Sequence, residues 1–181
     1  TLDYNARNCN GVSVGTNHPF SYSSISTINI GNDVEKIPEN FLYDMDSITT
    51  INFSNNITHI GKKAFAYYDG FTTLNLPDSI TYIGEEAFLE CDNLSSITLT
   101  NNLTYIGIGA FKGCGSLNSI TIPNNVTRID DEAFEDCINL NSVDFLTNNL
   151  TYIGDGAFKN CTSLNTFVVP NSVDSLGKQY G

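Results

Sequence analysis

The chain repeats one pattern of apolar and polar positions about every 23 residues. Each copy opens with apolar residues at its first, fourth and sixth positions, as in Leu94, Ile97 and Leu99. A polar residue separates the last two, and this alternation in β-branched sequence predicts a short strand with one buried face. Because successive copies are so alike, their strands are expected to lie parallel and about 4.8 Å apart.

The second half of each copy carries a different signal. Apolar residues at its tenth and thirteenth positions predict a second extended arm. The phrase Ile-Gly-x-x-Ala-Phe follows, beginning at residues 60, 83, 106 and 153, with Asp for Gly in the copy at 129 and a weaker version at 37. The glycine is expected to permit a bend, and the residues after it suit about one helical turn before the phenylalanine enters the core.

The repeat also defines the organisation of the chain. Six full copies occupy residues 25–163, and residues 164–181 carry a partial seventh. Residues 1–24 hold a degenerate copy, with Leu2 at its first position, which is expected to cap the stack. Leu146 lengthens one spacing to 24 residues and predicts a local bulge. We interpret the seventh copy as truncated, because its missing half would leave apolar edges uncovered, and expect the native polypeptide to continue beyond residue 181.

The unit L-x-x-I-x-L-P followed by I-G-x-x-A-F and a cysteine resembles the BspA-like leucine-rich repeat, and the resemblance covers residues 25–177. It implies a right-handed repeat solenoid of the leucine-rich α/β superhelix class, here mostly β. Parallel strands would line the concave face, with extended arms and short helical turns on the convex side. Leu103 follows Asn102 immediately, so no inward asparagine ladder is expected.

The net charge of the chain limits the classes of partner that it is expected to bind. The chain has 20 acidic and 8 basic residues, a net charge of −12, and a pI near 4.2. This balance argues against nucleic acid and anionic membrane surfaces as partners. No apolar run approaches the roughly 18 to 20 residues that cross a bilayer, so direct membrane insertion is not expected, and the first 30 residues lack the order of a signal peptide.

Four of the five cysteines share position 21 of the repeat. Other copies fill it with tyrosine or methionine, so the position is selected for apolar bulk rather than for a ligand atom. A column along a stack cannot gather four sulfurs around one ion, so no metal is expected. Disulfides between neighbouring coils and buried free thiols both stay open. The residues at this position are Tyr22, Met45, Tyr68, Cys91, Cys114, Cys137 and Cys161.

The sequence contains no recognisable catalytic or cofactor-binding motif. The two histidines are His18 and His59, and His59 lies where other copies place surface residues. The acidic stretch 130–136 lacks the spacing of a calcium loop. We therefore expect neither an enzyme nor a cofactor. Seven N-x-S/T sequons arise mostly from the repeat itself and are weak evidence for glycosylation; they begin at Asn52, Asn56, Asn93, Asn102, Asn125, Asn149 and Asn160.

Two surfaces are candidate binding sites. The first is the solvent side of the strands, a nearly uncharged row formed by Thr50, Asn52, Thr73, Asn75, Ser96, Thr98, Ser119 and Thr121. Such residues also simply solvate a sheet. The second is the stripe at position 12, formed by Tyr82, Tyr105, Arg128 and Tyr152. Tyrosine and arginine are common in recognition surfaces, yet their rings could equally lie flat over neighbouring coils.

These observations, with the resemblance to a family that includes surface adhesins, predict a non-enzymatic cell-surface or secreted recognition module. It would be an extracellular, monomeric module that binds a protein or glycan across an extended solenoid face. The alternative is a passive spacer or targeting array within a larger surface protein whose activity lies elsewhere.

Overall fold

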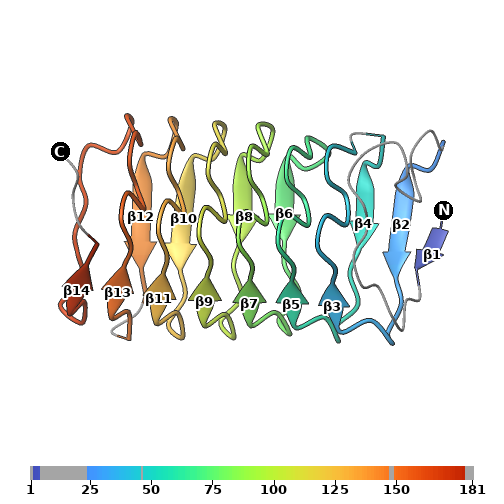
Figure 1. Cartoon of the computed structure of the whole chain (residues 1–181), viewed down its shortest axis with the longest axis horizontal. Coiled ribbons are helices and arrows are strands. Elements are labelled where there is room, and N and C mark those ends of the chain that lie inside the picture. The colour runs from blue at the N-terminus through green and yellow to red at the C-terminus, as the bar shows by residue number, and fades with distance from the viewer. Residues whose placement is uncertain (1, 5–23, 46, 147–148, 178–181) are drawn as a thin grey trace.

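The computed structural model describes residues 2–4, 24–45, 47–146 and 149–177. They form a stack of coils that runs nearly straight from the N-terminal to the C-terminal end (Figure 1). Each repeat contributes one coil, and the predicted parallel solenoid is confirmed. In this part of the chain there is no helix, hence none that is long and apolar enough to span a membrane.

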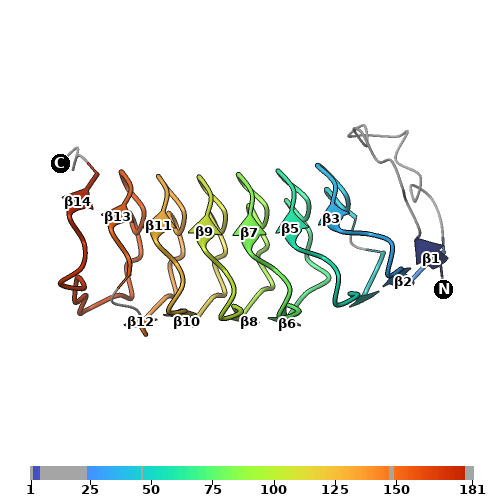
Figure 2. The ribbon, with the colours of Figure 1, turned by 90° about the horizontal axis from the view of Figure 1, so that it is seen from below.

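Every complete coil supplies two strands that lie on opposite sides of the stack (Figure 2). The longer ones correspond to the predicted strands, and we call their solvent side the long-strand face. They are β1 Leu2–Tyr4, β2 Thr27–Ile30, β4 Thr50–Asn52, β6 Thr73–Asn75, β8 Ser96–Thr98, β10 Ser119–Ile122 and β12 Ser142–Phe145.

The predicted extended arms form a second sheet of two-residue strands. Each strand pairs in parallel with its equivalent in the next coil, as in Tyr82↔Tyr105, so this sheet is continuous over seven strands. The strands are β3 Lys36–Ile37, β5 His59–Ile60, β7 Tyr82–Ile83, β9 Tyr105–Ile106, β11 Arg128–Ile129, β13 Tyr152–Ile153 and β14 Ser175–Leu176.

The core consists of columns in which each side chain contacts its equivalent in the neighbouring coil. The phenylalanine of the Ala-Phe phrase forms one such column, from Phe65 through Phe88, Phe111 and Phe134 to Phe158. Successive rings stack with centroids 5.1 to 5.3 Å apart. Four of the five are fully buried and Phe158 is partly buried. A coil therefore buries its apolar residues only against its neighbours.

The cysteine column is a packing column. All four cysteines are buried and free. Each thiol lies against a phenylalanine carbonyl of the preceding coil, as in Cys114 Sγ to the Phe88 carbonyl at 3.1 Å. Burial raises the pKa of Cys114, and raises that of Cys161 to about 11, so both thiols stay protonated at neutral pH.

The predicted helical turns are replaced by a different backbone. In the coil of Phe88, the amides of Glu86, Phe88 and Glu90 donate to carbonyls of the next coil at 2.7 to 2.8 Å. The alternate amides close tight turns within the coil, and Glu86 and Glu90 take a φ of +53°. Because every second amide points out of the coil, the i to i−4 bonds of a helix cannot form. The segment adds a further ladder between coils instead.

The repeat glycine is required by close packing rather than by a bend. A Cβ atom on Gly107 would lie 2.8 Å from the backbone carbon of Gly84 in the preceding coil, and Gly84 meets Gly61 in the same way at 2.9 Å. Neither glycine has a positive φ. The column therefore lets two backbones approach where a side chain would keep them apart.

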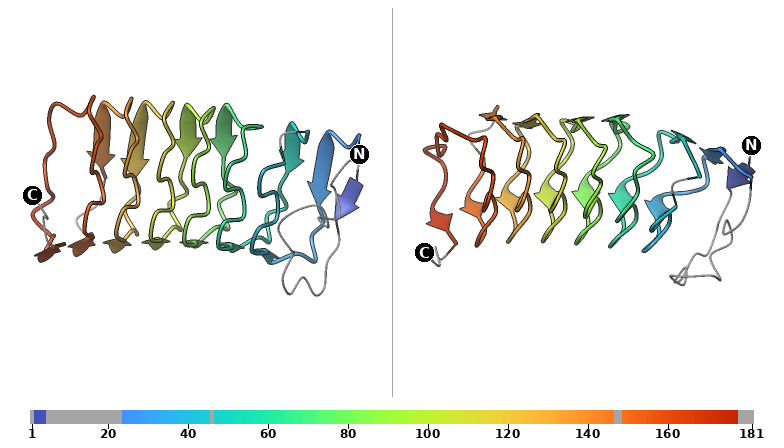
Figure 3. Two further views of the ribbon diagram at one scale, coloured as in Figure 1. Left: turned by 45° about the horizontal axis from the view of Figure 1, so that its top comes forward. Right: turned by 90° about the horizontal axis from the view of Figure 1, so that it is seen from above.

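The long strands do not form one uninterrupted sheet. They divide into β1-β2-β4, β6-β8 and β10-β12, and the views show the widest separation between β4 and β6 (Figures 1 and 3). Aromatic residues fill the interior here: Phe53, Tyr68 and Phe71 occupy positions that are leucine or cysteine in the coil that follows. Tyr68 packs against Phe71 at 4.8 Å and donates to the carbonyl of Ile48. These larger side chains lie at the widest separation of the long strands.

The chain departs from the regular repeat at the 24-residue spacing and at the N-terminus. The additional residue of the 24-residue spacing lies between Phe145, which pairs with Ile122, and Leu150; residues 147 and 148 are outside the described part. At the N-terminus, β1 pairs Leu2 with Ile28. Leu2 therefore aligns with the fourth position of the repeat rather than the first. Residues 5–23, which hold the rest of the predicted cap and Cys9, lie outside the described residues.

An ion-pair network replaces apolar packing at position 19 of three coils. Glu135, whose side chain is 5% exposed, contacts Lys112 Nζ at 2.6 Å and Lys159 Nζ at 2.5 Å. Burial raises the pKa of Glu135, but hydrogen bonds from the two lysines outweigh it and hold the pKa below its ordinary value. The carboxylate thus joins three successive coils.

Replacing Phe111 by alanine should test the core assignment. The change removes one ring from the middle of the stacked column, and we expect it to cost about 3 to 5 kcal/mol through the cavity left behind. Chemical denaturation measures this loss. Ile108→Ala, at a residue 44% exposed in the same coil, is the matched control and should change stability little. An unchanged unfolding midpoint for Phe111→Ala would show that the core is misassigned.

Glu135→Gln should lower stability in a pH-dependent way. A depressed folded pKa stabilises the fold above the unfolded value near 4.3, and this contribution is lost as pH falls through the folded pKa. We expect the variant to be about 1 to 3 kcal/mol less stable at pH 7 and close to wild type in strong acid. Urea unfolding at both pH values measures the difference.

The control for this experiment is Glu85→Gln. Glu85 pairs with Lys62 at 2.7 Å, but both side chains are 43% exposed. The effect should stay below about 1 kcal/mol at either pH. An equal effect of the two substitutions would contradict the assigned role of Glu135.

Candidate functional site

The long-strand face carries the first candidate site as predicted from alternation. Along β6, Thr73 and Asn75 are exposed while Leu74 between them is buried, and β8 repeats this pattern with Ser96, Ile97 and Thr98. All eight predicted residues are exposed; they are Thr50, Asn52, Thr73, Asn75, Ser96, Thr98, Ser119 and Thr121. The structure therefore brings these hydroxyl and amide groups together on one surface.

Most of these side chains have no partner within the fold. Asn52 Nδ2 donates to Asn29 Oδ1 at 2.7 Å. The other seven make no side-chain hydrogen bond to any residue that the structure describes. Their donors and acceptors are directed to solvent or to a partner, because the strands hold their backbones in register.

The stripe at position 12 lies on the short-strand sheet and forms a stacked column. Tyr82 and Tyr105 stack with centroids 4.9 Å apart and planes 11° from parallel, and the ring of His59 lies 5.4 Å from Tyr82. Arg128 lies 3.9 Å above the centroid of Tyr152. The rings thus cover one another and present mainly their edges to solvent.

Internal contacts occupy three polar groups of this stripe, whereas the Tyr82 hydroxyl makes no hydrogen bond to the described residues. The Tyr105 hydroxyl and Arg128 Nε both donate to the buried carboxylate of Asp130, and the Tyr152 hydroxyl donates to Asp131 at 3.2 Å. Burial, reinforced by the hydrogen bond to Asp130, raises the pKa of Tyr105. Sequence reasoning missed Asp130, although its replacement of the repeat glycine was visible. The stripe is therefore largely a structural cluster.

No constellation of catalytic or metal-ligating residues is found within the described part of the chain. Three or more His, Cys, Asp or Glu side chains do not gather there around a point that could hold a metal. Burial, followed by the charge of Lys36, lowers the pKa of His59. Thr58 Oγ1 lies 2.7 Å from its Nδ1.

The sequon asparagines hold neighbouring coils together. In all seven, Nδ2 donates to a group of the preceding coil, as in Asn102 to the carbonyl of Asp78 at 2.8 Å and Asn125 to that of Asn101 at 2.7 Å. The same amide nitrogen would carry a glycan. The repeat therefore has a structural reason to specify these asparagines.

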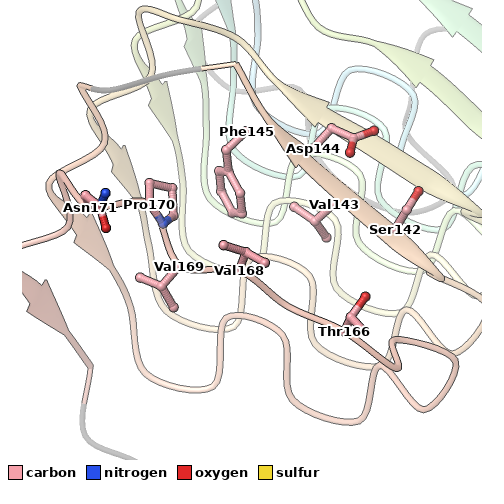
Figure 4. A pocket seen from close by; sticks show the side chains of 9 residues that line it. All are labelled: Ser142, Val143, Asp144, Phe145, Thr166, Val168, Val169, Pro170 and Asn171. Carbon is pink, nitrogen blue, oxygen red and sulfur yellow. The ribbon is translucent and has the colours of Figure 1, made fainter.

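A cavity of about 480 Å³ opens at the C-terminal end of the long-strand face. β12 forms one wall, and Thr166 with residues 168–171 of the last coil forms the other (Figure 4). No sequence signal predicted it, since it depends on how far two coils separate.

A scan against family models matches the chain to the BspA type leucine-rich repeat region, in 6 copies, over residues 9–70 and 58–180. A search of curated proteins gives no match. A leucine-rich repeat protein from Bacteroides ovatus is 33% identical, with a TM-score of 0.76, over 83% of this chain and 38% of that one.

Two further solved structures are similar. A leucine-rich repeat protein from Eubacterium ventriosum is 22% identical, with a TM-score of 0.75, over 84% of this chain and 41% of that one, and shows the fold alone. The T. pallidum leucine-rich repeat protein is 25% identical, with a TM-score of 0.71, over 80% of this chain and 69% of that one.

The chain thus spans 38% and 41% of the first two proteins. The family model covers almost the whole sequence, and the stacked coils show the architecture that this repeat specifies. The chain belongs to the BspA-type leucine-rich repeat family.

Proposed function

We propose that the chain is a non-enzymatic recognition module of a cell-surface or secreted protein, and that it binds a protein or glycan through the long-strand face. The observation that carries this proposal is the set of eight exposed, uncharged side chains on that face, seven of which have no hydrogen-bond partner within the described fold. A regular array of open donors and acceptors suits a polar partner surface.

The contrast between the two candidate surfaces supports this choice. In the position 12 stripe, the polar atoms of Tyr105, Arg128 and Tyr152 already bond to Asp130 and Asp131. A partner would have to break those contacts before it could use the same atoms. On the long-strand face binding displaces only water.

The family supports the expected location and class of partner. BspA-like repeats are found in surface adhesins, and the net charge of −12 disfavours nucleic acid. A protein or glycan outside the cell is therefore the partner we propose. The passive spacer stays the alternative, because the internally bonded stack would also serve as a rigid arm.

The test is binding to a printed panel of glycans and purified extracellular proteins. Ser96→Lys combined with Ser119→Lys places two charged, bulky groups on adjacent long strands, β8 and β10, and should weaken binding about tenfold. Tyr82→Ala with Tyr105→Ala should leave affinity unchanged. Asn55→Lys with Asn101→Lys, at exposed turns, controls for added charge.

Melting curves confirm that each variant is folded. Loss of binding only in the tyrosine variant would move the site to the position 12 stripe. Absence of any binding, or equal binding by all variants, would favour the spacer.

A further inference from the structure

From β2 onward, the departures from the repeat in the outward rows of the long-strand face gather at its C-terminal end. Its two outward rows are uncharged and polar from β2 to β10. After Asp3 of β1, which pairs with Asn29, the next charged residue in these rows is Asp144, and the first apolar residue after β1 is Val168, which is 80% exposed. Both line the cavity of about 480 Å³ (Figure 4). The cavity therefore differs chemically from the rest of the face.

The backbone beside the cavity lacks a ladder between two coils, as it also does between β4 and β6 and between β8 and β10. In an earlier coil, the amide of Leu76 donates to the carbonyl of Thr98 in the next coil at 3.3 Å. Phe145 holds the equivalent position in β12, yet its amide makes no such bond to the described residues of the last coil. Residues 165–170 form no strand. β12, like β4 and β8, pairs with a long strand on one side only and has an open edge on the other.

Apolar side chains lie along this open edge. Val143 and Phe145 point to the inward side of β12 but are only partly buried, although the Phe145 ring already packs against Phe167 of the last coil with centroids 5.6 Å apart. Val169, across the cavity, is 39% exposed. In Figure 4, Phe145 and Val143 face Val168 across the opening. An extended strand laid along β12 would cover these side chains and bond to the free edge at the same time.

We infer that the cavity binds an extended peptide strand of a partner protein, which pairs with the open edge of β12 and places a lysine or arginine beside Asp144. Successive side chains of a strand point to opposite faces. The inward residues of the peptide are therefore apolar and contact Val143 and Phe145, and the outward residue beside Asp144 is basic. The net charge of −12 favours a cationic strand over an anionic one. This inference rests on the proposed recognition function and deepens it.

The first test uses a labelled peptide, Thr-Val-Lys-Val-Thr-Val, and fluorescence anisotropy. It should bind the wild-type chain, and Asp144→Asn should weaken binding about three- to fivefold, as for an exposed charge pair. The peptide with Glu in place of Lys should prefer Asp144→Lys. A peptide with proline at both the central valine and the threonine after it should not bind, because one of these two amides faces β12 in either strand orientation and proline removes its ladder hydrogen bond. Asp78→Asn, at an exposed turn far along the chain, is the matched control and should change nothing.

The second test is hydrogen exchange of the backbone amides. Val143 and Phe145 should exchange rapidly in the free protein, unlike Leu76, and become protected when the lysine peptide is added. Protection already present in the free protein would overturn the inference. Sedimentation velocity would then show whether a second copy or residues 165–170 of the same chain cover the edge.

Failure of the lysine peptide to bind the wild-type chain, or equal affinity of the lysine and glutamate peptides for it, would also overturn the inference. The outcome is separable from that of the proposed function, because the Ser96→Lys and Ser119→Lys variant acts on β8 and β10. If that variant loses panel binding while Asp144→Asn behaves as wild type toward the lysine peptide, only the cavity assignment fails.

Discussion

Burial between coils is the constraint on which this structure depends. A 23-residue coil is too short to enclose its own apolar side chains, so Phe111 is covered by Phe88 on one side and Phe134 on the other. The polar backbone follows the same rule, because amides that would close a helix bond to the next coil instead. Apolar burial and hydrogen bonding thus favour the same stacked arrangement.

Local changes in this arrangement accompany substitutions within the repeat. Tyr68 in place of cysteine and Phe53 in place of leucine lie in the coil of β4, which is not paired with β6. Asp130 is a substitution in the glycine column. Its buried carboxylate accepts hydrogen bonds from the Tyr105 hydroxyl and from Arg128 Nε. The hydrogen bonds of Tyr105 and Arg128 in the position 12 stripe therefore depend on one interior substitution.

Periodicity predicted the strands, the extended arms and the columns of Phe and Cys, because each depends on residue type at a fixed position. The exposure of Ser96 and Thr98 followed from the same alternation. The prediction of helical turns was wrong, because the sequence pattern does not reveal that Glu86 and Glu90 adopt positive φ. The cavity beside β12 could not be predicted, since it depends on the separation of two coils rather than on the composition of either.

The direction of the hydrogen bonds has a mechanical consequence. In both strand ladders, and in the side-chain ladder from Thr81 to Thr58 and from Thr104 to Thr81, the bonds run along the stack. Tension applied to the two ends of the molecule would break these bonds one coil at a time. Each released coil of 23 residues would lengthen the chain by up to about 80 Å. A stack built this way would yield in steps under tension rather than break at a single force.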